Sequence, residues 1–308
     1  MAPTGKNARK RGPSEKQPKA HVARYLKSLE PQLVEGVKSS LLLKGNKCSE
    51  TMSTVLRDLR ALKSPAAKML TKKNDIQPFT DATSLEFLMT KNDCSLFSMA
   101  SHTKKRPNNL TLGRSFDGQL LDMVELGVSE YKSLGFFKGA PKKRVGSKPM
   151  FLFQGGEWET DDELKKLKNL FLDWFRGDPV ESLMMKGLDH VITLTKFEDD
   201  PVLRFRTYYV KLKKDPAGGT SPVPLLTNSG PDMDLTIRRT QFAPAELWSA
   251  SLKQPKALVK KKVKNQKTNV FGETVGRLHL ARQDVDRASG RRSRVIRRAE
   301  AAERREGE

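Results

Sequence analysis

The sequence has few of the residues that build metal centres or disulfide frameworks. Of its 308 residues, two are cysteines, Cys48 and Cys94, and four are histidines. Neither cysteine belongs to a CxxC pair, and no histidine cluster lies beside either of them. The pattern predicts reduced thiols in an intracellular protein, and no metal site.

Long apolar runs are also missing. A helix that spans a bilayer needs about 20 consecutive apolar residues, whereas the longest uninterrupted apolar run here is Met150–Phe153. No segment resembles the apolar core of a signal peptide, and the C-terminal tail lacks the aromatic and leucine face of an interfacial helix. We therefore expect no membrane contact.

The sequence lacks the common catalytic motifs as well. It contains no GxxxxGK[ST] nucleotide loop, no G-x-S-x-G elbow and no H-E-x-x-H pair. The acidic run Asp161-Asp162-Glu163 is predicted to open a helix, where acids complement the positive end of the helix dipole. We expect no enzymatic activity and no cofactor.

Positive charge, in contrast, is abundant. The formal net charge is +22, and it is concentrated at the two ends of the chain. Residues 1–27 contain eight Lys or Arg and one acid, and residues 253–308 contain seventeen Lys or Arg and seven acids, which leaves +5 for the segment between them. This distribution is typical of a folded body whose basic tails reach a polyanion, and nucleic acid fits better than a membrane surface.

The two ends have the composition of tails. Residues 1–28 contain too few apolar side chains to offset the entropy of ordering, and we expect a disordered basic arm there. Residues 253–308 form a second basic tail, with the candidate RNA contacts Lys260, Lys261 and Lys262 and an arginine-rich stretch after them. This tail is either a solvated, partly helical segment or an arm that orders on nucleic acid.

The first part of the body alternates strand and helix patterns. Ser39–Lys44 reads as a strand, and residues 49–62 have apolar side chains at helical spacing. Leu96–Ser101 and Asn109–Gly113 are strand-like runs on either side of a polar, Pro-containing loop, which predicts a hairpin with a basic tip. Leu120–Leu126 continues as a strand or a short helix.

The second part of the body repeats this order. Met150–Gln154 reads as a strand, and the helix expected at about 160–175 starts with a capping box formed by Thr160 and Glu163. The other expected elements are three strands and a Pro/Gly-rich turn region: strands His190–Thr195, Val202–Leu212 and Asp234–Arg239, and turn region 215–231.

The two parts share their pattern in detail. Leu41–Gly45 and Phe151–Gly155 each end a strand at a glycine, an amphipathic helix follows each, and a hairpin comes later in each half. We therefore predict an α/β (α+β) fold of two similar halves packed as one unit. The unit covers residues 29–252, with halves at about 29–140 and 148–252.

Three groups of basic residues in the body are candidate RNA contacts. The expected hairpin tip carries Lys104, Lys105 and Arg106, which can follow a phosphate backbone; the alternative is a solvated surface loop. Arg114, near the return strand, fits a structural ion pair as well as a phosphate contact. Arg238 and Arg239 adjoin in a strand, and strand alternation predicts that they point to opposite faces, with Arg239 preferred on the RNA side.

Several segments go beyond composition and resemble the Brix-domain superfamily. Two of them carry the candidate RNA contacts. The first, Ser101–Leu110 with Gly113–Asp117, looks specifically like one branch of the family, that of ribosome production factor 2, and Lys72–Phe79 with Ser84–Phe87 and Leu172–Gly177 support the same branch. The segments are Ser101–Leu110 with Gly113–Asp117, Gly230–Thr240, Lys72–Phe79 with Ser84–Phe87, Leu172–Gly177, and the pairs Phe271-Gly272 and Gly276-Arg277. The resemblance extends over roughly residues 30–280.

This resemblance implies a role in ribosome assembly. Members of the family have a Brix domain of two similar α/β halves and no expected catalysis. The branch implies binding to 5S rRNA and large-subunit rRNA, and a heterodimer with a regulator of ribosome synthesis protein. It also implies association with the ribosomal proteins of the 5S particle. The implied location is the nucleus, in the nucleolus. Two alternatives remain: a Brix protein acting at another pre-ribosomal RNA site, and a protein-interaction scaffold whose basic tails only localise it.

Overall fold

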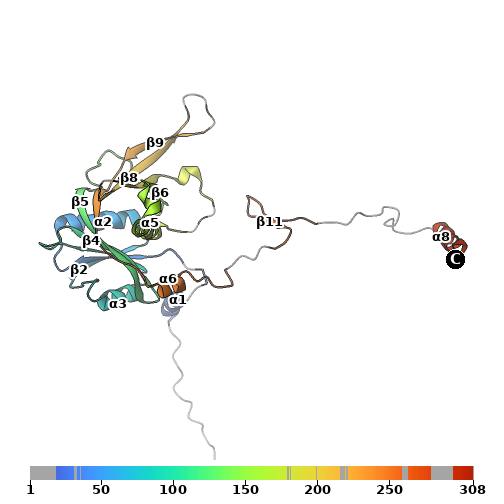
Figure 1. The fold of residues 1–308 in the computed structure, drawn as a ribbon, viewed down its shortest axis with the longest axis horizontal. Helices are drawn as coiled ribbons and strands as arrows, with labels where there is room; N and C mark the ends of the chain where they lie inside the picture. Colours follow the sequence, from blue (N-terminus) through green and yellow to red (C-terminus); the bar gives the residue numbers. More distant parts are fainter. Residues whose placement is uncertain are drawn as a thin grey trace, which may run out of the picture. The chain divides into compact units, whose positions relative to one another are not determined.

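The computed structural model describes residues 19–30, 33–34, 36–178, 180, 182–198, 200–215, 219, 221–258, 263–278 and 294–307. The chain divides into two compact units, Met1–Lys253 and Gln254–Glu308 (Figure 1). Lys260, Lys261 and Lys262 lie outside the described residues. In the described part of the chain, no helix is long and apolar enough to cross a membrane.

The first unit is built on one mixed sheet, to which each half of the body contributes five strands. Those of the first half are β1 (Ser40–Gly45), β2 (Ala67–Asn74), β3 (Leu96–Ser101), β4 (Asn109–Phe116) and β5 (Gln119–Lys132). Those of the second half are β6 (Met150–Gln154), β7 (His190–Lys196), β8 (Val202–Lys213), β9 (Val223–Asn228) and β10 (Asp232–Gln241). Leu120–Leu126, which the sequence left open between strand and helix, is therefore strand.

The strand order shows that the two halves are similar. It runs β2-β1-β3-β4-β5-β10-β8-β7-β6, with β9 paired to β8. In each half a parallel pair (β1 with β3, β6 with β7) is followed by antiparallel strands. The halves join where β5 pairs antiparallel with β10. The prediction of two similar α/β halves in one unit is confirmed.

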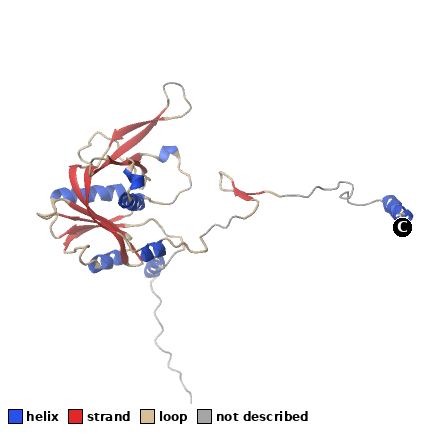
Figure 2. Cartoon of the chain, in the orientation of Figure 1, coloured by secondary structure: helices blue, strands red, loops and turns tan. Residues whose placement is uncertain are grey.

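Two long helices lie on the same side of this sheet, and Figure 2 shows the strands curving around them. They are α2 (Glu50–Lys63) and α5 (Asp162–Phe175). Both contribute buried residues to one apolar core, together with strand residues of both halves such as Leu112 and Leu194. The predicted apolar stripe of the second helix lies in this core: Leu164, Leu167, Leu170, Phe171 and Trp174. A shared core makes the halves one folding unit.

A smaller core covers the opposite face of the first half. Here α3 (Thr83–Lys91) places Leu85 and Met89 against Phe97 and Met123 of the sheet. The corresponding face of the second half is more open, since Met150 and Leu152 of the edge strand β6 are 43% and 39% exposed. The halves therefore differ in how this face is covered.

Three local predictions are corrected by the structure. The helix α5 is capped by Asp161, whose side chain accepts a hydrogen bond from the backbone N–H of Glu163, and not by Thr160, which ends the short helix α4 (Glu157–Thr160). The expected disordered arm contains the helix α1 (Ala20–Leu29), because its apolar residues have helical spacing. The Pro/Gly-rich turn region contains the strand β9, which pairs with the far end of β8.

The remaining described elements are short or exposed. The 3-10 turn η1 (Met185–Gly187) follows α5, and α6 (Ala245–Ser251) ends the first unit. The second unit has a small hairpin, β11 (Gln266–Thr268) with β12 (Thr274–Gly276), and the helix α8 (Arg294–Glu306). The described side chains of α8 are all exposed, and an exposed basic helix is compatible with either interpretation of this tail.

Candidate nucleic-acid interface

The predicted hairpin is confirmed as β3 and β4, and it places two lysines at its tip. Backbone N–H groups of Thr103 and Arg106 donate to each other's carbonyl oxygens at 3.1 Å, which closes a tight turn with Lys104 and Lys105 in its two central positions. Both lysines are exposed. The turn therefore presents two neighbouring ammonium groups to solvent.

The base of this loop is tied to the helix α2. Asn108, with a left-handed backbone φ of 44°, donates its backbone N–H to Nδ1 of His102 at 3.1 Å. Its side-chain oxygen accepts from the hydroxyl of Ser49 at 3.1 Å, and that hydroxyl in turn caps α2 by accepting from the N–H of Met52. The loop is thus anchored at both of its ends.

Arg238 and Arg239 point to the same face, so the prediction of opposite faces is wrong. The pairing of β10 with β5 matches Ile237 to Leu126 but Arg239 to Glu125, with a register shift between Ile237 and Arg239. A β-bulge adds one residue to a strand and breaks the alternation of its side chains. Ile237 packs on the shared core, whereas both arginines lie on the other face.

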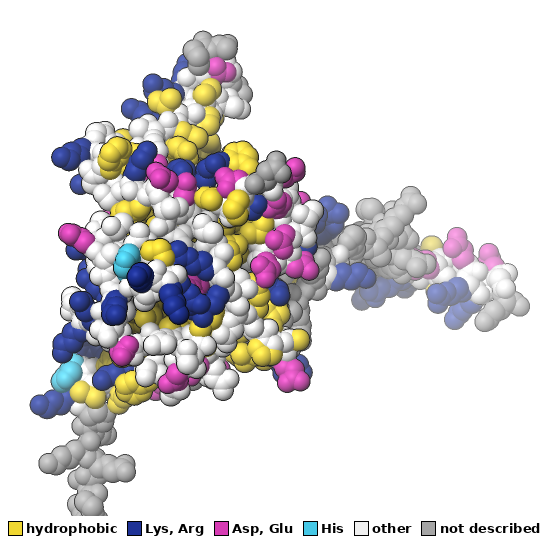
Figure 3. Space-filling view, turned by 60° about the vertical axis from the view of Figure 1, so that its left-hand side comes forward, with side chains coloured by type: hydrophobic (Ala, Val, Ile, Leu, Met, Phe, Trp, Pro, Cys, Tyr) yellow, Lys and Arg dark blue, Asp and Glu magenta, His cyan; other side chains and the backbone are white. Residues whose placement is uncertain are grey.

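Arg106, Arg238 and Arg239 meet on this face, and we call them the arginine cluster. Arg239 donates to Oε2 of Glu125, and the guanidinium of Arg106 lies 3.5 Å from the same oxygen. Arg238 donates to Oδ1 of Asn109 at 2.9 Å and to the carbonyl of Pro107 at 2.8 Å. The hairpin loop, β5 and β10 are therefore connected at one place, and Figure 3 shows Lys and Arg side chains gathered on one face of the molecule.

The cluster remains open to solvent. The side chains of Arg106 and Arg239 are 43% and 39% exposed, and Arg239 lies over the ring of Phe79 with 4.0 Å between guanidinium carbon and ring centroid. A guanidinium has five N–H donors, so each of these arginines keeps donors for a ligand. Planar donors of this kind suit phosphate oxygens, and arginine on an aromatic ring also suits a stacked base.

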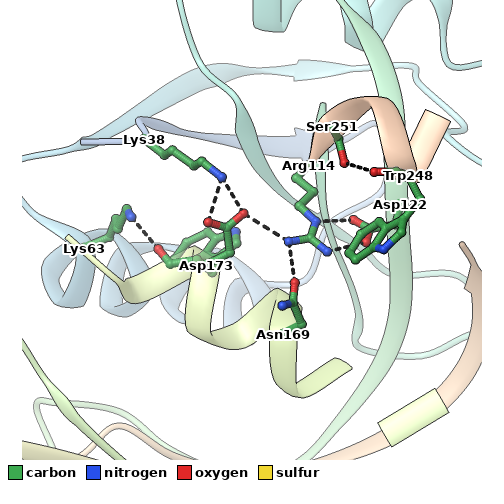
Figure 4. Close-up of polar contacts among 9 residues, drawn as sticks. Lys38, Lys63, Arg114, Asp122, Asn169, Asp173, Trp248 and Ser251 are labelled. Atoms are coloured by element: carbon green, nitrogen blue, oxygen red, sulfur yellow. Dashed lines mark hydrogen bonds and ion pairs between the residues drawn. The ribbon is translucent and has the colours of Figure 1, made fainter. Parts of the chain in front are cut away.

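Arg114 has a different place, and it is withdrawn from the candidate RNA contacts. Its side chain is 7% exposed and binds Asp122 with two hydrogen bonds of 2.8 and 2.7 Å. It also donates to Asn169 at 2.8 Å and to Asp173 at 3.1 Å, both on α5, and Trp248 of α6 covers it (Figure 4). The structural ion pair is the correct interpretation, because the guanidinium has no open side for a phosphate.

The charges of this network act on one another. Burial alone would lower the pKa of Arg114, but the hydrogen bonds and charges of Asp122 and Asp173 outweigh it and raise that pKa. Burial likewise acts to raise the pKa of Asp173, whereas Lys38, at 2.7 Å, and Arg114 together hold it below its usual value. The network joins β4 and β5 of the first half to α5 of the second, so its role is to hold the halves together.

A further buried cation lies where the halves meet. Lys63, at the end of α2, donates to the backbone carbonyl of Trp174, and burial lowers the pKa of its ammonium group to about 8. It lines a largely apolar cavity of about 500 Å³ together with Leu62, Pro65 and Phe175. No acidic partner binds Lys63 directly among the described residues, and its contact with a carbonyl is structural.

The nearest approach to a catalytic set is Ser147, Asp189 and His190. Asp189 and Ser147 lie 2.7 and 3.3 Å from the same nitrogen, Nδ1 of His190, while Nε2 is buried and has no hydrogen-bond partner in the described part of the chain. In a catalytic triad, the nucleophile and the acid that orients the histidine bind different nitrogens of the imidazole ring. The group instead fixes the connection between the halves. The described residues contain no cluster of His, Cys, Asp and Glu able to hold a metal.

Sequence reasoning missed three members of the interface: Phe79, Asn109 and Glu125. A signal existed for Glu125, because it interrupts the apolar run of β5 between Val124 and Leu126. An acid at such a position predicts a buried partner cation. The partners themselves come from segments far away in the sequence.

Residues 45–239 match the family model of the Brix domain. The chain is a member of the Brix-domain family. It is 41% identical over 276 residues to the ribosome production factor 2 homolog of Drosophila melanogaster. These aligned residues make up 89% of this chain and 84% of the fly protein. The homologs of Homo sapiens (42% over 253 residues, 82% and 81%) and Schizosaccharomyces pombe (40% over 287 residues, 91% and 90%) are similar over most of their length. Within its family the chain thus falls in the ribosome production factor 2 branch, and it is a ribosome biogenesis factor.

Proposed function

We propose that this chain is a non-catalytic assembly factor that binds ribosomal RNA and helps bring the 5S rRNA particle into the large-subunit precursor in the nucleolus. The observation that carries the proposal is the arginine cluster beside the lysine tip of the hairpin. Arg106, Arg238 and Arg239 present guanidinium donors on one face, and Lys104 and Lys105 extend from the loop that Arg238 holds. The names of the relatives support ribosome production as the setting.

The geometry favours RNA over an acidic protein surface. The cluster combines planar donors, which fit phosphate oxygens in pairs, with an arginine stacked on Phe79. Arginine and aromatic planes are the surfaces on which single-stranded bases stack. In this view the basic tail at residues 253–308 adds phosphate contacts that do not depend on sequence.

The second half of the fold supports a protein partner as well. In the first half, α3 covers the outer face of the sheet and β2 pairs with the edge of β1. In the second half, Met150 and Leu152 on the edge strand β6 are exposed. Exposed apolar side chains on a strand edge favour association. We propose that the regulator of ribosome synthesis protein covers this region, and that the ribosomal proteins of the 5S particle join the assembly through the RNA.

The experiment that tests RNA binding compares two pairs of exposed lysines. Lys104→Ala with Lys105→Ala removes the tip of the hairpin, and Lys211→Ala with Lys213→Ala removes the same charge from β8. We expect the first pair to weaken binding to 5S rRNA and to reduce the slope of log K against log salt by about 0.7–0.9 for each phosphate that is no longer neutralised. The second pair is expected to change both quantities little.

Equal effects of the two pairs would mean that only overall charge matters, which supports the scaffold alternative. A Brix protein acting at another RNA site would show the hairpin effect on pre-ribosomal RNA but not on 5S rRNA. Thermal unfolding of each variant is the control, since exposed substitutions change stability by only about 0.5 kcal/mol or less.

A further inference from the structure

Glu125 occupies an unusual position for an acidic residue. It lies in the middle of β5, is fully buried, and has neighbours on either side, Val124 and Leu126, that pack in the shared core. A carboxylate loses its hydration when it is buried, and apolar residues in the place of a buried ion pair are often as stable or more stable. Stability alone therefore does not explain an acid here.

The contacts of Glu125 point to its role. Its Oε2 atom binds Arg239 of β10 and lies 3.5 Å from the guanidinium of Arg106 in the hairpin loop. Its Oε1 atom is buried and has no hydrogen-bond partner in the described part of the chain. One carboxylate oxygen thus connects two arginines that come from distant segments and that would otherwise repel each other.

The third arginine of the cluster is held by other contacts. Arg238 is bound by Asn109 and the carbonyl of Pro107, and its guanidinium lies next to Gly127, two residues beyond Glu125. A Cβ atom at Gly127 would come within 2.7 Å of its guanidinium nitrogens, so the strand leaves this space for the arginine. Arg239 in addition lies on Phe79. Each of the three guanidiniums therefore has a defined position before any ligand arrives.

We propose that Glu125 is the positioning residue of the RNA site: its buried carboxylate fixes Arg106 and Arg239 so that both can bind phosphate groups of one RNA strand. This inference rests on the proposed RNA binding. A carboxylate lowers the net positive charge of the site by one and so weakens its attraction for RNA. It also orders the two arginines in advance, so binding RNA costs less side-chain entropy than it would with two free arginines. Fixed guanidiniums also bind phosphate in pairs of hydrogen bonds, which free ones do less often.

The test relies on the fact that net charge and positioning predict opposite effects of one substitution on the affinity for RNA. Glu125→Gln makes the protein more positive by one charge, so attraction alone predicts tighter binding to 5S rRNA. Positioning predicts weaker binding, by about tenfold, since the absence of one charge-assisted hydrogen bond accounts for roughly that factor. It also predicts a salt slope smaller by about 0.7–0.9 for each arginine that no longer meets phosphate.

Two further variants make the result independent of charge and of folding. Glu130→Gln makes the same change of charge at an exposed position of β5, and it should leave binding unchanged or slightly tighter. Glu125→Asp keeps the charge but withdraws it by one methylene group, and it should weaken binding in the same direction as Glu125→Gln. Thermal unfolding curves give the temperature range in which every variant is folded, and affinities are measured within that range.

Binding by Glu125→Gln that equals or exceeds that of the wild type, in a folded protein, would overturn the positioning role while RNA binding itself stands. Absence of salt-dependent binding in the wild-type chain would instead remove the proposed function. If Glu125→Gln and Glu125→Asp weaken binding while Glu130→Gln does not, the role of Glu125 is established.

Discussion

Arg114 and Arg239 both pair with acids of β5, yet their surroundings give them different roles. Arg114 lies against α5 and beneath Trp248, with Asp122, Asn169 and Asp173 using its donors. Arg239 lies on the outer face, partly exposed over Phe79. The burial of the guanidinium, and not the presence of an acid, separates a residue that joins the halves from one that is free to meet a ligand.

Replacement of Arg114 by Gln tests this distinction at the residue scale. The change leaves Asp122 and Asp173 buried without their cation, which costs about 3–5 kcal/mol when one partner of a buried pair is removed. We expect a large loss in the free energy of unfolding, measured by urea titration. The affinity for 5S rRNA should stay at the wild-type value when measured where the variant is folded. A loss of affinity without a loss of stability would return Arg114 to the RNA site.

At the scale of elements, the two halves share a row of four strands, β1-β3-β4-β5 and β6-β7-β8-β10, but have different coverings. The helix α3 fills the outer face of the first half with Leu85 and Met89, whereas Met150 and Leu152 of β6 remain exposed in the second. An edge strand with exposed apolar residues tends to acquire a partner, by strand addition or by an element laid on its face. This asymmetry is what motivates the proposed heterodimer.

Replacement of Leu152 by Asp tests the covering of the second half. The charge would have to be buried on complex formation, so we expect weaker association with the regulator of ribosome synthesis protein in co-purification and titration calorimetry. Leu172→Asp is the matched control, because Leu172 of α5 is 38% exposed, close to the 39% of Leu152. If both variants bind the partner as the wild type does, the interface lies elsewhere.

At the scale of the whole molecule, most of the net positive charge lies at the two ends of the chain, and the arginine cluster is a separate basic site in the body. The arginine cluster belongs to the first unit, and residues 253–308 contain seventeen Lys or Arg against seven acids. In the proposed function, the tail supplies attraction to RNA that depends mainly on charge and salt, and the cluster supplies fixed geometry. The two should therefore separate in a salt titration.

Removal of residues 254–308 should lower the affinity for RNA and flatten the plot of log K against log salt, by about 0.7–0.9 for each phosphate that the tail neutralises. The thermal midpoint of the remaining unit should change little, because it is compact by itself. A neutral Gly/Ser tail of equal length is the control for excluded volume. An unchanged slope would show that the tail does not touch phosphate.

Patterns along the chain determined the elements and the fold class of this protein. Helical spacing of apolar residues predicted α2 and α5, and the repeat of strand, glycine, helix and hairpin predicted two similar halves. Such patterns are local, because a helix or strand buries one face at a fixed period. The basic hairpin tip and the uneven distribution of charge are equally visible in the sequence.

Only the tertiary structure decided which arginines share a surface. A register shift in β10 places Arg238 and Arg239 on one face, although strand alternation predicted two different faces. Such a bulge depends on how β10 pairs with β5, and the sequence of β10 alone does not encode it. Arg114 became structural because α5 of the other half supplies Asn169 and Asp173. Glu125 joins Arg106 to Arg239 across segments that only the folded sheet brings together. The sequence thus determined the elements through local periodicity, whereas contacts between distant segments, which no local pattern encodes, determined the role of each charged side chain.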